Sequence, residues 1–146
     1  MLKDSLIVTG ALKIVLADAQ GNIKDEREVE NLVVTVGKNY IASRMIGVSD
    51  NVMSHMAIGT GVTAPVVGNT TLGTEAGRVA LTSSTRTNNN VEYIATFPPG
   101  TGTGAITEAG IFGAASAGIM LCRTVFSVIN KGAADTLGIT WTVTVN

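Results

Sequence analysis

The chain has 146 residues, the length of one ordinary domain, and we expect residues 1–146 to form a single domain with one hydrophobic core. Apolar residues make up 45% of the sequence and charged residues only 14%, and the formal net charge at pH 7 is −1. This balance argues against a protein that attracts nucleic acid or an anionic membrane by its charge.

The N-terminal part predicts a β-hairpin. Apolar residues alternate with polar ones from Leu6 to Leu16, which is typical of a strand with one buried face. A turn around Gly21 follows, and residues 23–30 form a second strand with Val29 directed inward. The many charges of this second strand indicate a solvated edge that resists pairing with other chains.

Nothing near the N-terminus predicts a membrane segment or an exported protein. Asp4 precedes the apolar run and Lys13 interrupts it, so the likeness of this run to a signal peptide is superficial. No apolar segment approaches the ~20 residues that cross a bilayer. The single cysteine, Cys122, cannot form an internal disulfide. We therefore expect synthesis in the cytoplasm and no membrane partner.

One helix is predicted, over residues 35–46. Thr35 can cap its N-terminus, and Gly47 can end it. Apolar residues recur within it at a spacing of three to four positions, at Val36, Tyr40, Ile41 and Met45. We expect this helix to lie across the sheet.

From Met53 onward, short apolar runs alternate with loops rich in Gly, Thr, Pro and Asn. We expect strands at residues 53–58, 79–87, 91–97, 105–112, 119–129 and 137–145. The run Ile119–Ile129 is apolar on both faces, which indicates a central covered strand, and Trp141 falls on the core face of the last strand. About eight strands and one short helix predict a mainly β protein, an antiparallel β-sandwich or jelly roll, with a partly open barrel as the alternative.

The candidate catalytic and metal-binding residues are few and isolated. His55 is the only histidine and has no second histidine or cysteine at ligand spacing, so we interpret it as a residue packed within the sheet. Cys122 sits in an apolar strand and is expected to be inert. Glu75 and Glu108 could form a carboxylate pair of the glycosidase type, but nothing in the sequence brings them together. The acidic residues of the second strand, at Asp25, Glu26, Glu28 and Glu30, are interspersed with Lys24 and Arg27 and indicate a solvated surface.

Glycine-rich and repeated segments also lack a chemical signature. The runs 59–61 and 100–104 are not followed by the residues of a phosphate-binding loop, and we interpret them as flexible connections. Thr74-Glu75-Ala76-Gly77 recurs as Thr107-Glu108-Ala109-Gly110, which favours two loop-to-strand junctions whose glutamates bond nearby amides over a duplication. We therefore expect no enzyme, no catalytic, cofactor-binding or metal-binding residue, and no cofactor.

Charge is concentrated in the first third of the chain. Residues 1–50 hold thirteen charged side chains and residues 51–146 only eight. The long neutral part is either buried within the domain or covered by neighbouring subunits. Neutral loops suit such contacts because they avoid the desolvation of buried charges. The candidate contact segments are residues 1–5, 60–69, 85–90 and 100–104.

Several segments together resemble the small virion structural proteins of tailed bacteriophages, in particular the capsid cement (decoration) proteins of short-tailed phages. The resemblance covers the chain from about Leu6 to the end. The segments are Asn31-Leu32-Val33-Val34, Met56-Ala57-Ile58-Gly59-Thr60-Gly61 with Thr63-Ala64-Pro65, Leu72-Gly73-Thr74-Glu75 with Arg78, Phe97-Pro98-Pro99-Gly100, Ile106-Thr107-Glu108-Ala109-Gly110-Ile111-Phe112, and the closing strand Leu137 to Val145.

This resemblance implies a protein of the outer capsid surface that binds and stabilises the lattice of the major capsid protein. It implies no catalytic residue, and no nucleic acid, membrane or small-molecule partner. A clamp between two capsomers is most simply built with two-fold symmetry, so we expect a homodimer rather than a trimer. A tail-fibre, collar or baseplate component is the first alternative, although one domain without a fibre shaft favours the capsid. A saccharide-binding module is the second.

Overall fold

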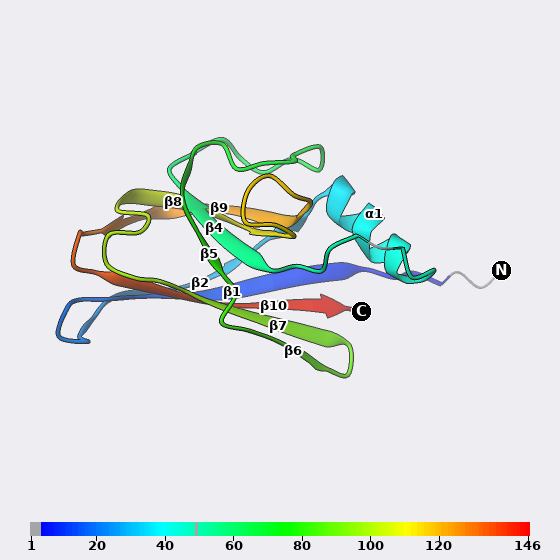
Figure 1. Ribbon diagram of the computed structural model, residues 1–146, viewed down its shortest axis with the longest axis horizontal. Coiled ribbons are helices and arrows are strands. Elements are labelled where there is room, and N and C mark those ends of the chain that lie inside the picture. The colour runs from blue at the N-terminus through cyan, green and yellow to red at the C-terminus, as the bar shows by residue number, and fades with distance from the viewer. Residues whose placement is uncertain (1–3, 49) are drawn as a thin grey trace.

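The computed structural model describes residues 4–48 and 50–146, which form two antiparallel five-stranded sheets packed face to face (Figure 1). Sheet A has the order β2 (Ile23–Glu30), β1 (Val8–Ala17), β10 (Thr136–Val145), β7 (Asn90–Phe97) and β6 (Ser83–Thr87). Sheet B has the order β3 (Leu32–Val33), β9 (Met120–Lys131), β8 (Gly104–Phe112), β4 (His55–Gly59) and β5 (Glu75–Ala80). The prediction of a mainly β, antiparallel sandwich is confirmed.

The core lies between the two sheets and takes alternate residues from each. Leu12, Ile14 and Leu16 of β1 and Trp141 of β10 are buried from sheet A, as period-two patterning requires. Sheet B contributes a matching set to the same cluster, including Met56, Ile58, Ile106, Ile111 and Ile129. The prediction that Trp141 faces the core is confirmed, and its indole N–H donates a 2.9 Å hydrogen bond to Asn31 Oδ1.

The first hairpin forms as predicted. The turn is closed by Asp18, whose Oδ1 accepts 2.9 Å hydrogen bonds from the amides of Gln20 and Asn22, and Gly21 has φ +84°. Strand β2 lies at the edge of sheet A with its glutamates exposed, and Val29 packs against the core. The expected charged edge strand is therefore confirmed.

Helix α1 (Thr35–Arg44) begins and ends differently from the prediction. Thr35 does not cap it: the N-cap is Val34, which is fully buried and makes no side-chain cap. The Thr35 amide instead donates a 2.8 Å hydrogen bond to the carbonyl of Val67. The helix ends at Arg44, two residues earlier than predicted, with Met45 as C-cap, and Gly47 follows at φ +65°. Packing against β9 and the loop around Val67 thus replaces the expected cap.

The strand predicted over residues 79–87 is wrong, because the chain changes sheets there. Strand β5 ends at Ala80 in sheet B, and β6 begins at Ser83 in sheet A. Of the two residues between them, Leu81 donates its N–H to Ser54 O (2.9 Å) beside sheet B, and Thr82 donates to Ile94 O (2.7 Å) in sheet A. This crossing and the short strand β3 give ten strands in the described ranges instead of eight.

Strand β9 is covered on both faces in its first part, whereas the prediction covered residues 119–129 and Ser127 and Val128 are exposed. Its residues from Met120 to Thr124 are all buried. One side faces the core, and a second small cluster of Val34, Ala57, Leu72, Phe112 and Met120 lies on the other. No helix in residues 4–48 and 50–146 combines the length and the apolar character that a membrane crossing needs.

Candidate functional site

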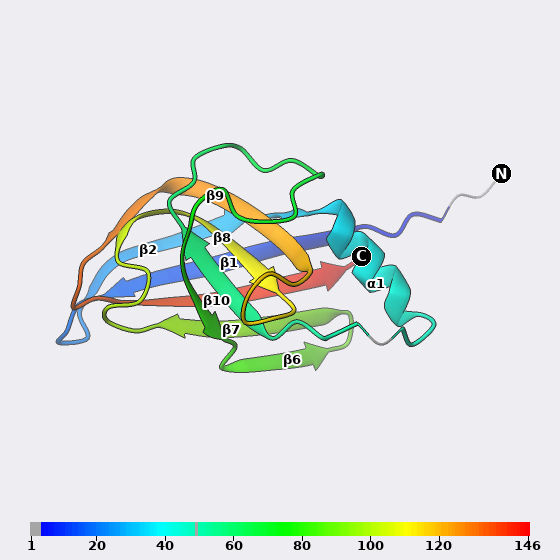
Figure 2. The ribbon, with the colours of Figure 1, turned by 45° about the horizontal axis from the view of Figure 1, so that its top comes forward.

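Residues 60–74 connect β4 to β5 and lie over the outer face of sheet B; we call this segment the valine loop (Figures 1 and 2). Strands β4 and β5 pair directly, so a tight turn could join them. The chain instead makes a long excursion that contains no charged residue. Such a loop needs something that fixes its path.

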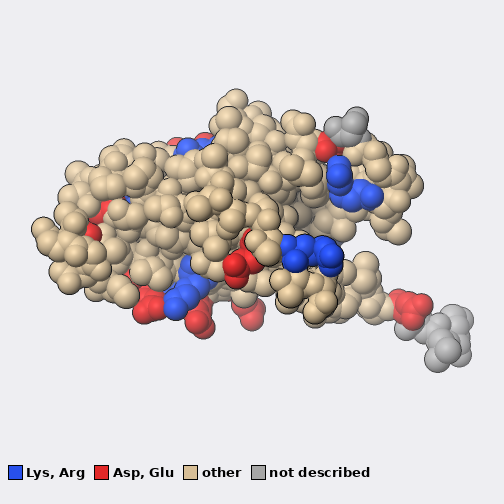
Figure 3. Space-filling model, turned by 60° about the horizontal axis from the view of Figure 1, so that its bottom comes forward, with Lys and Arg blue, Asp and Glu red and all other residues tan. Residues whose placement is uncertain are grey.

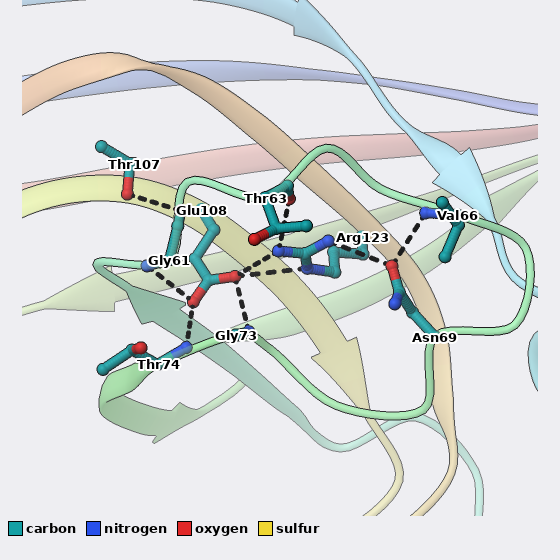
Figure 4. A network of polar contacts seen from close by, with 9 residues as sticks. All are labelled: Gly61, Thr63, Val66, Asn69, Gly73, Thr74, Thr107, Glu108 and Arg123. Atoms are coloured by element: carbon teal, nitrogen blue, oxygen red, sulfur yellow. Dashed lines mark hydrogen bonds and ion pairs between the residues drawn. The ribbon is translucent and has the colours of Figure 1, made fainter.

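The buried carboxylate of Glu108 holds both ends of the valine loop (Figure 4). Glu108 lies on β8, is fully buried, and points to the outer side of the sheet. Its Oε1 accepts hydrogen bonds from the amides of Gly61 (3.0 Å) and Thr74 (2.7 Å). Its Oε2 accepts one from the amide of Gly73 (2.8 Å). One side chain thus binds the chain where it leaves β4 and where it approaches β5.

Arg123, on the neighbouring strand β9, holds the middle of the same loop. Its guanidinium is buried and donates to Glu108 Oε2 from Nη2 (2.8 Å) and Nε (3.2 Å). The remaining donors reach the Thr63 carbonyl (3.0 Å) and Asn69 Oδ1 (3.0 Å). Asn69 Oδ1 also accepts the amide of Val66 (2.9 Å). The Glu108–Arg123 pair therefore fixes the loop at its ends and at its centre.

Hydrogen bonding keeps Glu108 ionised in its buried position. Burial by itself raises the pKa of this carboxyl, but the amides of Thr74 and Gly73, the Arg123 guanidinium and the Gly61 amide lower it by more. The net pKa of Glu108 lies below its ordinary value. The pair is charged at neutral pH, and both carboxylate oxygens are engaged by donors.

The glycines at the start of the valine loop allow the chain to approach Glu108 closely. A Cβ at Gly61 would lie 2.6 Å from Glu108 Oε1, and one at Gly59 would overlap the Thr74 carbonyl oxygen. In the other glycine-rich run, Gly102 has φ +67°, and a Cβ there would lie 2.5 Å from Ile58 Cδ1. The runs connect strands as predicted, except that Gly59 is the last residue of β4, and close packing or a positive φ favours glycine at these positions.

A second arginine fixes the adjacent loop on the same face. Arg78 of β5 pairs with Glu75 (2.6 Å) and donates to the carbonyls of Ala114 (2.9 Å) and Ala117 (2.8 Å) in the β8–β9 loop. Its guanidinium lies 3.8 Å from the centroid of the Phe112 ring, which is a cation–π contact. The outer face of sheet B therefore carries two loops, each held by its own arginine.

The repeated Thr-Glu-Ala-Gly segments have different positions and roles. The first is a loop-to-strand junction as predicted, but the second lies inside β8, so the prediction of two junctions is wrong. Glu108 does bind backbone amides, although they are 34 to 47 residues away in sequence, and Glu75 binds Arg78 instead. Both glutamates lie opposite Gly59, on the two strands that flank β4. Each is neutralised by its own arginine, and neither is placed as a free acid or base.

The other candidate residues have local structural partners. His55 begins β4, and its Nδ1 lies 2.8 Å from Ser54 Oγ. Cys122 is fully buried, and burial raises the pKa of its thiol, which disfavours the reactive thiolate. Within the described ranges, no three His, Cys, Asp or Glu side chains gather in a way that could hold a metal ion.

The valine loop presents apolar side chains to solvent. Val62 is 74% exposed, Val66 56% and Val67 51%. These side chains project from a backbone that the Glu108–Arg123 pair holds in place. On the side that lies at the bottom of Figure 1, charged atoms also form only a few small groups within a mostly uncharged surface (Figure 3). An apolar, uncharged and pre-organised loop is suited to binding another protein.

Comparison of the chain with protein-family models, curated proteins and solved structures finds no significant match. Sequence reasoning singled out Glu108 and the glycines but missed Arg123 and Asn69. A buried arginine in an apolar strand was the available signal, because a lone charge within such a strand requires a buried partner.

Proposed function

We propose that this protein is a structural component of a tailed-phage virion, a capsid cement protein that binds the major capsid protein lattice on the outer surface of the particle. The observation that carries the proposal is the valine loop, an uncharged apolar segment fixed by a buried ion pair. The chain is not an enzyme in this proposal and needs no cofactor.

The resemblance to virion proteins supports the proposal because three of its six segments meet at or beside this loop. Met56–Gly61, Leu72–Glu75 with Arg78, and Ile106–Phe112 are far apart in sequence. In the fold, Gly61, Gly73 and Thr74 bind Glu108, and Arg78 lies over Phe112. Three of the segments that carry the likeness therefore shape the proposed binding surface.

The physical mechanism is the docking of a pre-formed apolar surface. A loop already fixed by hydrogen bonds loses little conformational entropy on binding. Burial of the exposed valines on binding contributes a favourable free energy of roughly 25 cal/mol per Å² of apolar surface. No charge on the loop has to be desolvated. Modest affinity per copy is sufficient in a capsid lattice, because many copies that bridge adjacent subunits add avidity.

The finer fold assignment, a jelly roll, stays a prediction. Local hairpins supply β1–β2 and β6–β7 to sheet A and β4–β5 and β8–β9 to sheet B. A jelly roll is built from two Greek keys, and the proposed function does not depend on which sandwich topology applies.

The position of the chain in purified virions, determined by electron cryomicroscopy, tests the proposal. Hundreds of copies on the outer capsid surface are expected. A few to some tens of copies at the tail would replace the capsid role with the tail-fibre, collar or baseplate alternative. Absence from the particle, together with glycan binding by the isolated protein, would support the saccharide-binding alternative instead.

Binding of variants to particles stripped of the protein tests the valine loop itself. Val62→Asp and Val67→Asp place a charge on the proposed contact and should each weaken binding by about tenfold or more. Ile23→Asp is the matched control, because Ile23 is 61% exposed and lies on the β2 edge. Loop variants that bind as tightly as the control would show that another surface makes the contact.

A further inference from the structure

One edge of strand β1 is left open near the N-terminus. Strand β2 pairs with β1 only from Ala11 onward, and Asn31 then donates its N–H to the Gly10 carbonyl (3.0 Å). Before Gly10, no strand of the described ranges pairs with β1 on this side. On the other side, Ile7 and Asn146 exchange two backbone hydrogen bonds (3.2 and 2.7 Å). Because backbone groups alternate along a strand, those of Leu6 and Val8 point to the open edge.

Helix α1 forms the opposite wall of a groove along this edge. The groove has a volume of about 380 Å³ and is lined by Leu6, Ile7, Val8, Lys38, Ile41, Ala42 and Met45. Val8 and Lys38 also line a second hollow of about 430 Å³, together with Gly10. An open strand edge facing a helix across an apolar groove is the geometry that accepts an added strand. Figures 1 and 2 both place α1 and the N-terminal segment at the same end of the molecule.

The apolar side chains around this groove are unusually exposed. Leu6 is 73% exposed, and Met45 and Ile46, at the end of α1, are 86% and 82% exposed. Such a group of large apolar side chains marks an interaction site. The rest of this edge of sheet A is different, because β2 covers β1 there and carries charges along its length that oppose pairing.

We propose that a second copy of this chain occupies the groove, with segment 4–8 of each copy paired antiparallel to the same segment of the other across a two-fold axis. Leu6 then lies opposite Leu6 of the second copy, and Asp4 lies opposite Val8. In this register, the backbone groups that face the open edge in both copies bond each other. The ladder ends at Val8, two residues before Gly10, beside which Asn31 lies.

Charge complementarity favours a second copy as the occupant. Asp4 is the one charged residue of segment 4–8. The proposed register places it opposite Val8, which lines both hollows together with Lys38. Each half of the dimer therefore gains an Asp4–Lys38 contact between copies. The two Leu6 side chains meet on the α1 side of the sheet, where Ile41 and Met45 can cover them. This inference rests on the open edge of β1, the groove and the charges beside it. It does not depend on the proposed virion role.

The oligomeric state of the full chain tests the proposal. Sedimentation equilibrium at concentrations up to about 100 μM should show a dimer of the wild type. Leu6→Asp should raise the dimer dissociation constant at least tenfold. Val8→Pro should do the same, because it removes an N–H that points to the open edge and not to β10. Ile23→Asp is the matched control and should remain a dimer with the wild-type dissociation constant.

A charge exchange keeps the test valid if Val8→Pro disturbs β1. Asp4→Lys and Lys38→Asp should each raise the dissociation constant by about tenfold, and the double variant should return toward the wild-type value. A monomeric or trimeric wild type would overturn the proposal. A dimer that is indifferent to Leu6→Asp and to the charge exchange would also overturn it, since the copies would then meet elsewhere.

Discussion

Gly61 and Gly68 lie in the same loop, yet their surroundings leave different amounts of space for a side chain. A Cβ at Gly61 would lie 2.6 Å from the Glu108 carboxylate, whereas one at Gly68 meets no atom within 4 Å. Neither backbone has a positive φ, so steric space alone separates the two positions. Close packing therefore requires glycine at position 61, whereas position 68 has room for a side chain.

This difference predicts opposite outcomes for two alanine substitutions. Gly61→Ala should destabilise the protein by about 1–3 kcal/mol, because overpacking displaces the Glu108 carboxylate from its donors. Gly68→Ala should leave stability unchanged or raise it by about 0.4–1 kcal/mol, because alanine restricts the unfolded chain. Urea unfolding of both variants measures the effect. Equal stability of the two would contradict the close approach at Gly61.

Removal of the Glu108 charge should lower the stability of the folded protein at neutral pH. Glu108→Gln leaves the buried Arg123 guanidinium without its counter-charge, which costs about 3–5 kcal/mol for a buried pair. The folded-state pKa of Glu108 is lowered, so its stabilising contribution is complete above its ordinary pKa of 4.5. It is lost as the pH falls through the folded-state value. The stability gap between wild type and Glu108→Gln should therefore narrow in acid, as urea unfolding at pH 7 and pH 3 can measure. A gap that stays constant would show that the charge is not responsible.

Helix α1 illustrates at the element scale how packing overrides intrinsic preference. Gly37 is buried in the helix, and a Cβ there would overlap the backbone carbonyl of Leu121 on β9. The close approach explains why a residue that is unfavourable in helices occupies this position. It also explains how the helix comes into close contact with β9.

Two substitutions in α1 separate packing from propensity. Gly37→Ala gains about 1 kcal/mol of helix propensity but must push the helix away from β9, so a net destabilisation of about 1–3 kcal/mol is expected. Asn39→Ala, on the exposed face, should raise stability by a few tenths of a kcal/mol. Thermal unfolding of both variants, with hydrogen exchange over residues 35–44, checks the result. Stabilisation by Gly37→Ala would mean that the helix is not in close contact with β9.

Element prediction from the sequence succeeded where one segment keeps one environment. Strands β1 and β10 and the charged edge β2 were predicted because each alternates between a single buried face and a single exposed face. Residues 79–87 failed because the chain passes from sheet B to sheet A at Leu81 and Thr82 without a Gly, Pro or Asn to mark the crossing. The Thr35 cap failed because its amide is bound by the Val67 carbonyl of a distant loop.

At the scale of the whole molecule, two apolar surfaces lie on different parts of the sandwich. The valine loop covers the outer face of sheet B, and the groove lies between the N-terminal part of β1 and α1. In the proposals made above, the first surface contacts the capsid and the second joins two copies. A dimer of this kind carries two valine loops and can bridge two neighbouring capsid subunits.

This arrangement predicts that dimerisation strengthens particle binding. A monomeric Leu6→Asp variant keeps its valine loop but loses the second attachment, so its apparent affinity for stripped particles should fall by about 10²–10⁴-fold. Binding isotherms of wild type and variant measure the ratio, and Ile23→Asp serves as the control. Equal affinities would show that each copy binds alone, without contradicting the dimer itself.

The sequence by itself determined the mainly β class, the buried faces of most strands, the charged edge and the single short helix. These follow from periodicity, which each segment carries within its own residues. Only the tertiary structure decided that Glu108 binds both ends of the valine loop, that Arg123 binds its centre, and that β5 and β6 belong to different sheets. The physical reason is that a buried charge requires partners but does not specify where in the chain they lie. The path of the folded chain selects them.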